Sequence, residues 1–330
     1  MKKILITGAA GFIGYHLARN LLSRSDVRLA LIDNLSRGKM DDEFKELIKD
    51  KRVQFLNTDL TREGSLEEIG GGFDHVYHLA AVNGTKNFYT MPHEVLRINI
   101  LTLMEVLRWM VKHNRSGKLL FTSSNEAYAG ALEAFGNLPL PTPEDVPFVI
   151  ADLKNPRWSY GATKMIGEFL VAYYAKHYGF RAVIVRPHNF YGPRAGFDHV
   201  IPEFCLRIAQ QPDTFEIFGA DQTRSFCFID DAVEALRLLM ESDYPEEELP
   251  HVFHIGSSEE VAIRELAELL FDVSGWKPKS VAVREAPEGS VRRRVSDVRK
   301  IKNMIGWEAR TPLREGLSAT YAWYSLKRKD

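Results

Sequence analysis

The chain contains few cysteines and no strong excess of charge of either sign. Its 330 residues include only two cysteines, Cys205 and Cys227, which lack a Cys-x-x-Cys spacing and a third ligand nearby. We therefore expect two buried, reduced thiols. The ten histidines form no His-x-x-x-His pair, so we also expect no metal site. The formal net charge of −1 gives no electrostatic reason to expect nucleic acid or an anionic membrane as a partner.

Long apolar runs are also absent. The longest fall far short of the roughly twenty residues that a membrane-spanning helix needs. The chain begins with a predicted strand rather than with a charged and then apolar leader. We therefore expect a cytoplasmic protein without a membrane-spanning segment. The sequence shows no internal repeat and no low-complexity tract.

Short apolar runs alternate with amphipathic stretches from residue 1 to about residue 190. Strands are expected at Lys3 to Thr7, Val27 to Ile32, Arg52 to Leu56, His75 to Leu79, Lys118 to Ser123 and Arg181 to Arg186. The clearest helices between them are expected at Phe12 to Ser23, His93 to Lys112 and Ser159 to His177. This alternation predicts an α/β fold with a Rossmann-type, doubly wound parallel sheet, whose strand order reverses beside the first strand. Ligands of such sheets bind beyond the carboxyl ends of the strands.

The pattern changes after Arg186, where four prolines divide the chain into short pieces. We expect the later helices, Asp231 to Met240 and Ile263 to Val273, to be separated by loops rather than by regular strands. The segment from Gly130 to Pro156 is predicted to be an irregular loop. The domains are therefore predicted as 1–190, a Rossmann domain, and 191–330, a smaller mixed α/β C-terminal domain, with some later segments able to return to the first domain.

The first predicted strand runs into a glycine-rich turn. Gly8, Gly11 and Gly14 have the Gly-x-x-Gly-x-x-Gly spacing of a strand-to-helix turn that binds a dinucleotide. Gly8 can adopt a positive φ, Gly11 lets the backbone approach a pyrophosphate, and Gly14 lets the helix lie close to the strand. Asp33 ends the second strand about twenty residues later, where a carboxylate binds the ribose hydroxyls and favours NAD over NADP. Arg37 leaves that choice open.

Tyr160 and Lys164 are four residues apart on a predicted helix and therefore share a face. The pKa of a free tyrosine is about 10, and a neighbouring ammonium together with a nicotinamide cation would favour the phenolate. Ser124, at the end of a predicted strand, could hydrogen-bond the same substrate oxygen. The three side chains predict a base that takes a proton from a hydroxyl group during its oxidation.

Five segments together resemble the motif series of the extended short-chain dehydrogenase/reductases, and more narrowly their nucleotide-sugar epimerases, dehydratases and decarboxylases. The segments are Thr7 to Gly14, His78 to Ala81, Ser124 to Tyr128, Tyr160 to Lys164 and Arg186 to Arg194. The resemblance extends from residue 2 to about residue 318. It implies tightly held NAD, a nucleoside-diphosphate sugar as substrate, oxidation at C4 to a transient ketone, and a homodimer built through the helices at 93–112 and 159–177.

The resemblance also implies positions for the ligand contacts. The cofactor-binding residues would be Gly8, Gly11, Phe12, Ile13, Gly14, Asp33, Asn34, Asp59, Leu60, Leu79, Ala80, Ala81, Tyr160, Lys164 and Pro187. The substrate-binding residues would be Asn83, Thr85, Asn189, Arg224 and Arg294. Arg224 lies in the segment Gln222 to Asp231, which resembles the UDP-glucuronate decarboxylases, as does the arginine-rich stretch Arg292 to Asp297. A solvated basic run is the alternative reading of that stretch.

The triplet Ser124, Asn125 and Glu126 bears most directly on the reaction. In the related dehydratases and decarboxylases the third position is a glutamate, and in the dehydratases it takes the C5 proton, whereas simple 4-epimerases usually have no carboxylate there. Glu126 therefore favours a dehydratase or a decarboxylase. Asn125 departs from the dehydratase pattern, because an amide cannot donate a proton as an aspartic acid can. Tyr160, Lys164, Ser124, Glu126 and Asn125 are thus the expected catalytic residues.

Two alternatives stay open at this stage. One is a 4-epimerase, which needs no base at C5. The other is a non-catalytic NAD(H)-binding sensor or scaffold, which would not need Ser124, Tyr160 and Lys164 together. The sequence names neither the nucleotide base nor the sugar, and UDP is preferred because the most similar segments belong to enzymes of UDP-sugars.

Overall fold

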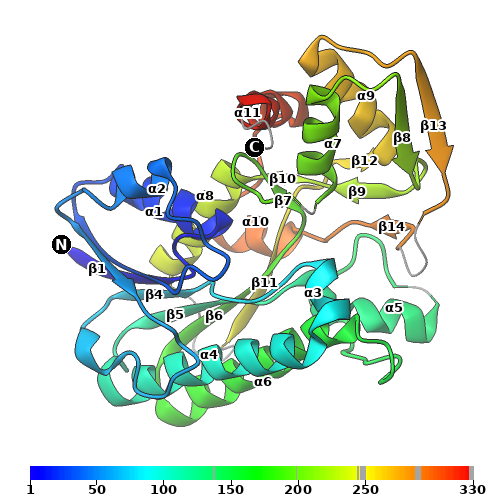
Figure 1. The fold of residues 1–330 in the computed structure, drawn as a ribbon. Helices are drawn as coiled ribbons and strands as arrows, with labels where there is room; N and C mark the ends of the chain where they lie inside the picture. Colours follow the sequence, from blue (N-terminus) through cyan, green and yellow to red (C-terminus); the bar gives the residue numbers. More distant parts are fainter. Residues whose placement is uncertain (137, 198, 244, 246–249, 287–290, 327–330) are drawn as a thin grey trace. The chain divides into compact units, whose positions relative to one another are not determined.

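A computed structural model describes residues 1–136, 138–197, 199–243, 245, 250–286 and 291–326. Its main sheet has seven strands in the order β11-β6-β5-β4-β1-β2-β3 (Figure 1). These strands are β1 (Lys2–Thr7), β2 (Val27–Asp33), β3 (Val53–Asn57), β4 (His75–His78), β5 (Lys118–Thr122), β6 (Arg181–Pro187) and β11 (His251–Ile255). The pairs from β3 across to β6 are all parallel. The predicted Rossmann-type order, with its reversal beside β1, is therefore confirmed.

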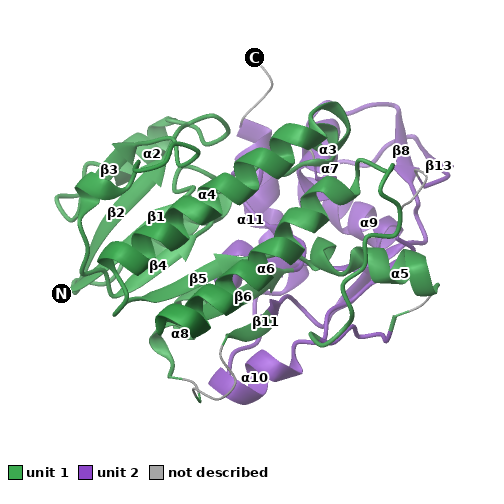
Figure 2. Cartoon of the chain, turned by 90° about the horizontal axis from the view of Figure 1, so that it is seen from below, with its two compact units in different colours: residues 1–138, 144–187, 233–253 green, residues 139–143, 188–232, 254–330 purple. Residues whose placement is uncertain are grey.

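Helices cover both faces of this sheet. One face carries α1 (Phe12–Leu22), α2 (Asp42–Leu47) and α8 (Ile229–Glu241), and the other carries α4 (Pro92–His113) and α6 (Trp158–Tyr178), which lie side by side (Figures 1 and 2). Leu5 and Val76 of the sheet pack with Trp109 of α4 and Val171 of α6 in one buried cluster. Shorter helices are α3 (Thr85–Thr90) and α5 (Ala129–Phe135), with 3₁₀ turns η1 (Glu67–Ile69) and η2 (Asn125–Ala127).

The chain folds into two compact units, shown in Figure 2. Unit 1 comprises residues 1–138, 144–187 and 233–253, and unit 2 comprises residues 139–143, 188–232 and 254–330. Unit 2 contains α7 (Val200–Ala209), α9 (Ile263–Ser274), α10 (Arg299–Ile305) and α11 (Leu313–Leu326), of which α7, α9 and α11 pack together. Its strands are β7 (Phe190–Tyr191), β8 (Thr214–Phe218), β9 (Thr223–Ser225), β10 (Cys227–Phe228), β12 (Glu260–Ala262), β13 (Ser280–Arg284) and β14 (Arg293–Arg294). They pair as β10-β7, β12-β9-β14 and β13-β8.

Two expectations about the chain beyond residue 129 are wrong. The segment from 130 to 156 is not irregular throughout, because α5 occupies its start. Short strands, rather than loops alone, separate the later helices, and β11 returns to complete the main sheet. The new strands are two to five residues long, too short for an alternating pattern to stand out from the surrounding turns.

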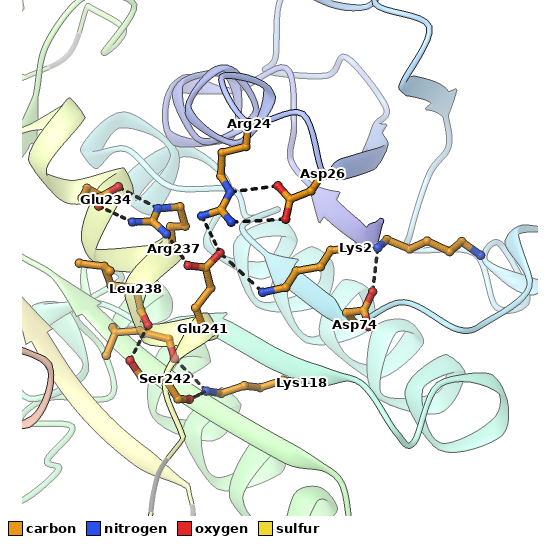
Figure 3. A network of polar contacts seen from close by, with 12 residues as sticks. Lys2, Arg24, Asp26, Asp74, Lys118, Glu234, Arg237, Leu238, Glu241 and Ser242 are labelled. Atoms are coloured by element: carbon orange, nitrogen blue, oxygen red, sulfur yellow. Dashed lines mark hydrogen bonds and ion pairs between the residues drawn. The ribbon is translucent and has the colours of Figure 1, made fainter.

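Polar contacts tie the end of α8 to the sheet edge at which β1 and β5 begin (Figure 3). Arg24 pairs with Glu241 at 3.3 Å, and Lys2 reaches the same carboxylate at 3.7 Å. Lys118 of β5 donates to the carbonyl oxygens of Leu239 and Ser242 at 2.8 and 2.6 Å. Burial lowers the pKa of Lys118 to about 8. This network anchors the edge opposite the carboxyl ends of the strands.

Cys205 and Cys227 are both buried and unpaired, as predicted. Burial raises the pKa of each thiol. Among the described residues no helix combines the length and the apolar character that crossing a membrane requires. The same part of the chain holds no cluster of three or more histidine, cysteine, aspartate or glutamate side chains arranged to bind a metal ion.

Candidate active site

The glycine turn lies between β1 and α1 and has the close packing that its spacing predicts. Gly8 has φ +69°, and a Cβ built there would lie 2.8 Å from the backbone nitrogen of Ala80. A Cβ at Gly14 would lie 2.3 Å from the carbonyl oxygen of Gly8. At Gly11 the added Cβ meets only that carbonyl oxygen, at 3.2 Å, so a side chain there would project into open space at the start of the helix. The turn therefore fits the pyrophosphate of a dinucleotide, which binds at such helix starts.

Asp33 ends β2 with its carboxylate held by two backbone amides. Its oxygens accept from Ala10 at 3.0 Å and from Leu35 at 2.7 Å. Burial raises the pKa of Asp33, and these two amides oppose that shift. The guanidinium of Arg37 donates to the carbonyl oxygen of Ala81 and to the side-chain oxygen of Asn83. The carboxylate is thus fixed at the strand end where a ribose would bind.

The other residues expected to bind the cofactor belong to the same unit. Phe12 and Ile13 begin α1, Asn34 follows β2, and Pro187 ends β6. Leu79 and Ala80 follow β4, where their amides donate to the carbonyl oxygen and the hydroxyl of Thr7. Ala81 comes next, and Asp59 and the buried Leu60 follow β3. All of these residues stand at or just beyond the carboxyl ends of the strands or at the start of α1.

Tyr160 lies in the first turn of α6, and its side chain is buried. Its hydroxyl makes hydrogen bonds with Ser124 and Asn83. Phe88 of α3 stacks on the phenol ring, with centroids 5.1 Å apart and an angle of 15° between the planes. Tyr160 and Ser124 therefore come together as predicted, and Asn83, expected to contact the sugar, touches the tyrosine.

Burial dominates the ionisation of Tyr160 and raises its pKa to about 12. The hydrogen bonds from Ser124 and Asn83 and the charge of Arg37 act in the opposite direction, whereas the carboxylate of Glu126 raises the pKa further. A tyrosine in this environment needs more positive charge before it can act as a base near neutral pH.

Lys164 lies one helical turn beyond Tyr160 and is fully buried. Its Nζ donates to the carbonyl oxygen of Thr122 at 2.7 Å and lies 5.5 Å from the centroid of the Tyr160 ring. Burial lowers the pKa of Lys164 to about 7, and Glu168 opposes this shift. The shared helix face that the spacing predicts is thus confirmed.

The triplet after β5 forms the 3₁₀ turn η2, capped by Ser124. The Ser124 Oγ accepts from the backbone nitrogen of Glu126 at 3.2 Å and donates to Asn125 Oδ1 at 3.4 Å. Asn125 is buried, and the carboxylate of Glu126 is 4.0 Å from the guanidinium of Arg157. Glu126 therefore brings a charged oxygen to the site beside Tyr160, and Asn125 brings an amide.

Asn99 of α4 is a buried amide that organises the loop after β4. Its Oδ1 accepts from the backbone nitrogen of Val82 at 2.7 Å, and its Nδ2 donates to the Val82 carbonyl oxygen at 3.0 Å and to the Thr163 hydroxyl at 3.2 Å. These contacts fix the chain just before Asn83. Thr85 begins α3 and is exposed.

The remaining substrate candidates lie in unit 2 and meet around β9. Arg224 and Arg294 are paired positions of β9 and β14, and both are half-buried. Arg224 donates to the carbonyl oxygen of Thr223 at 2.7 Å and to the side chain of Gln222 at 3.1 Å. Asn189, with φ +43°, donates to the carbonyl oxygen of Ser225 at the end of β9, at 2.8 Å. Asn189 and Arg224 precede Arg294 by 105 and 70 positions in the sequence, yet all three lie in one small region around β9.

Sequence reasoning missed three residues at this site. Phe88 packs on Tyr160, Arg37 orients Asn83, and Arg157 pairs with Glu126. The sequence could have indicated Arg157, because this residue lies three positions before Tyr160 and just before a predicted helix. The other two depend on how the loops after β2 and β4 meet, which no local pattern reports.

Comparison with known proteins gives a consistent set of relatives. Residues 4–256 match the NAD dependent epimerase/dehydratase family. The chain is 31% identical to a UDP-N-acetyl-alpha-D-glucosaminuronate decarboxylase of Bacillus cytotoxicus, over 98% of both chains. It is also 31% identical to GDP-mannose 3,5-epimerase 1 of Oryza sativa subsp. japonica, over 97% of this chain and 81% of that one.

Solved structures agree with the fold. A UDP-glucose 4-epimerase of Thermotoga maritima with UDP-glucose matches with a TM-score of 0.82 and 28% identity, covering 98% of this chain and 99% of the other. A UDP-glucuronic acid 4-epimerase of Bacillus cereus in complex with NAD matches with a TM-score of 0.83 and 26% identity, covering 99% and 100%. The match with each of these proteins extends over nearly the whole of both chains.

Proposed function

Because this chain belongs to the NAD dependent epimerase/dehydratase family, we propose that it oxidises a nucleoside-diphosphate uronic acid at C4 and then removes its carboxyl group. It is an enzyme, and NAD is its cofactor. The observation that carries the proposal is the place of Glu126, whose backbone packs directly on Gly161, the residue that follows Tyr160. A reaction confined to C4 has no need of a carboxylate at that place.

Tyr160 is proposed as the base that takes the proton of the C4 hydroxyl. Ser124, which is hydrogen-bonded to the same phenol, orients the substrate oxygen and helps to carry the proton. Lys164 supplies positive charge on the helix face that carries Tyr160. NAD⁺ held by the glycine turn and Asp33 would supply a hydride acceptor for C4 and a positive charge that favours the tyrosinate.

The chain's residues favour loss of carbon dioxide over loss of water. A C4 ketone acidifies C5 and lets a C5 carboxylate leave as carbon dioxide without help from an acid. Elimination of water also needs a proton donor for the leaving hydroxyl, and Asn125 cannot be that donor. After carbon dioxide leaves, C5 must gain a proton, and Glu126 is proposed to pass this proton from water to C5. Dehydration stays the second outcome, because Glu126 serves it equally well as a base.

Unit 1 is proposed to hold the cofactor and unit 2 the nucleotide part of the substrate, which approximates the predicted division at residue 190. Arg224 and Arg294 are neighbours in unit 2 and offer guanidinium donors suited to a diphosphate, with Asn189 beside them. Asn83 and Thr85 are proposed near the sugar. UDP is the proposed nucleotide, supported by the relative that is a decarboxylase of a UDP-linked uronic acid.

A 4-epimerase is the second candidate, supported by the 4-epimerases among the similar structures. It would use Tyr160, Ser124 and Lys164 in the same way and return the hydrogen to the other face of C4. The non-catalytic alternative is set aside, because the chain belongs to a family of enzymes.

Product analysis tests the function. The purified enzyme is incubated in deuterated water with UDP-, dTDP- and GDP-linked hexoses and uronic acids, and the products are weighed by mass spectrometry. We expect a product that has lost carbon dioxide and gained deuterium. Loss of water with deuterium would indicate a dehydratase, and an isomer of unchanged mass without deuterium would contradict a role for Glu126 at C5.

Replacing Glu126 by glutamine should separate the two stages. We expect Glu126→Gln to oxidise C4 within about tenfold of the wild-type rate. The rate of product formation should fall by roughly 10²-fold or more, the usual contribution of a positioned base. Reduced cofactor would then accumulate in a single turnover, which absorbance measures. Equal losses in both stages would contradict a separate role for Glu126.

We also propose that the enzyme is a homodimer through α4 and α6. Ile166, Phe169 and Tyr173 of α6 are 46%, 55% and 64% exposed, and Leu96 and Leu101 extend the apolar surface onto α4. Several exposed apolar side chains on two adjacent helices are typical of an interface between copies. Phe169→Glu should yield a monomer in sedimentation velocity, whereas Leu153→Glu, which changes an apolar side chain outside these helices that is 92% exposed, should not.

A cytoplasmic location stays a prediction, supported by the two unpaired thiols.

A further inference from the structure

Glu126 and Arg157 form a charged pair beside the tyrosine proposed as the base. Glu126 Oε2 and Arg157 Nη2 are 4.0 Å apart, and each side chain is 20% exposed. The backbone of η2 packs directly on the start of α6, because a Cβ at Gly161 would lie 2.6 Å from the carbonyl oxygen of Glu126. Since Gly161 follows Tyr160, the carboxylate, the guanidinium and the phenol belong to two segments in direct contact.

Contacts other than Glu126 hold Arg157 in place. Its backbone nitrogen donates to Asn155 Oδ1 at 3.1 Å, which fixes the chain where it enters α6. Its guanidinium lies 5.5 Å from the centroid of the Trp158 ring, a cation–π arrangement. Contacts with Asn155 and Trp158 therefore help to position the positive charge that meets the carboxylate.

The charges that face Tyr160 come from three elements. Arg37 reaches it from the loop after β2, Lys164 from α6 itself, and Glu126 from η2, while Asn83 after β4 and Ser124 after β5 add neutral hydrogen bonds. Arg37 favours the tyrosinate, and Glu126 opposes it. Glu126 therefore opposes formation of the tyrosinate in the first step, although the proposed chemistry at C5 requires this carboxylate.

We propose that Arg157 is a positioning residue whose positive charge offsets the negative charge of Glu126 beside Tyr160. The tyrosinate can then form readily while the carboxylate stays ionised for its own step. The pair lets one site hold a base for C4 and a base for C5 without mutual repulsion. This inference rests on the proposed role of Tyr160 and not on the identity of the step after C4 oxidation.

A double-mutant cycle tests the inference. The pH dependence of cofactor reduction in the first turnover is measured for the wild type, Arg157→Met, Glu126→Gln and the double variant, with the nucleotide sugar that the wild type oxidises. We expect Arg157→Met to move the profile toward higher pH by about one unit, the size of effect that a neighbouring charge produces. Glu126→Gln should move it toward lower pH, and the double variant should match Glu126→Gln, because Arg157 is proposed to act on Tyr160 through the Glu126 carboxylate.

Two controls complete the cycle. Arg157→Lys keeps the charge and should retain most of the wild-type profile. Arg157→Gln is a second neutral variant that should shift the profile as Arg157→Met does, and it replaces Arg157→Met if that variant folds poorly. An unchanged profile for Arg157→Met, or equal shifts caused by Arg157→Met with and without Glu126, would overturn the inference. A merely structural role would lower the rate at every pH and leave the profile in place.

A second readout separates this inference from the proposed function. With NAD⁺ bound and no sugar present, the tyrosinate absorbance of each variant is titrated against the same variant carrying Tyr160→Phe, so that the difference reports Tyr160 alone. The same order of shifts is expected. If no nucleotide sugar is oxidised, the proposed function fails, yet this titration still decides whether Arg157 acts on Tyr160 through Glu126.

Discussion

Tyr160→Phe is expected to abolish turnover, with a loss of at least about 10³-fold in the rate of C4 oxidation, within the range that a positioned acid–base group contributes. The change removes one oxygen from a ring that is buried against Phe88, and the ring itself keeps its packing. The lost hydroxyl is the proposed base, and it is also the group through which Tyr160 is hydrogen-bonded to Ser124 and Asn83. The measurement is cofactor reduction in a single turnover with saturating nucleotide sugar.

Two comparisons make this result specific to chemistry. NAD binding by Tyr160→Phe, measured by calorimetry, should stay within a few-fold of wild type, because the glycine turn and Asp33 are unchanged. Tyr324→Phe removes another buried hydroxyl, which donates to the carbonyl oxygen of Gly196, and should retain activity while losing stability by about 1 kcal/mol. Turnover by Tyr160→Phe close to that of the wild type would contradict the proposed base.

The sheet could be predicted because its strands are buried on both faces. The runs at 27–32, 118–123 and 181–186 are predominantly apolar, and each proved to be an interior strand with ends within one residue of prediction. Tertiary context reinforces the local signal in such strands. In contrast, β11 carries His251 and His254 and follows a long excursion through unit 2, so only the hydrogen bonds of β6 give it its place.

The site was predictable where its residues follow from helix or strand geometry. Tyr160 and Lys164 share a face by spacing alone, and the glycine turn has contacts that only glycine allows. The approach of Asn83 to Tyr160 was not predictable, because it depends on Asn99 anchoring the loop after β4 and on Arg37 crossing from the loop after β2. The same holds for Arg224 and Arg294, whose adjacency exists only through the pairing of β9 with β14.

A buried ion pair joins Glu168, one helical turn beyond Lys164 on α6, to Arg186 of β6. Glu168 binds Arg186 of β6 through two contacts of 2.8 Å each, and the two side chains are only 6% and 3% exposed. Glu168 also accepts from the hydroxyl of Ser123, beside Ser124. The pair thus connects the helix of Lys164 to the strand ends that form the site.

Glu168→Gln is expected to destabilise the protein by about 3–5 kcal/mol, because it leaves the Arg186 guanidinium buried without a countercharge. Glutamine preserves the side-chain volume, so the loss reports charge rather than a cavity. Urea unfolding followed by tryptophan fluorescence measures the free energy of unfolding. Glu94→Ala, which breaks the solvent-exposed pair with Arg97 on α4, should cost far less.

The double variant Glu168→Gln with Arg186→Met decides whether the uncompensated charge is the cause. Methionine keeps an apolar stem against the rings of Tyr128 and Phe148, over which the Arg186 guanidinium lies at 5.4 and 5.1 Å from the centroids. If the buried charge dominates, the double variant should be more stable than Glu168→Gln alone, since removing the second partner also removes the desolvation penalty. If the two losses instead add, the stabilising element is the hydrogen-bonded geometry around Ser123, and the pair serves chiefly to align α6 with β6.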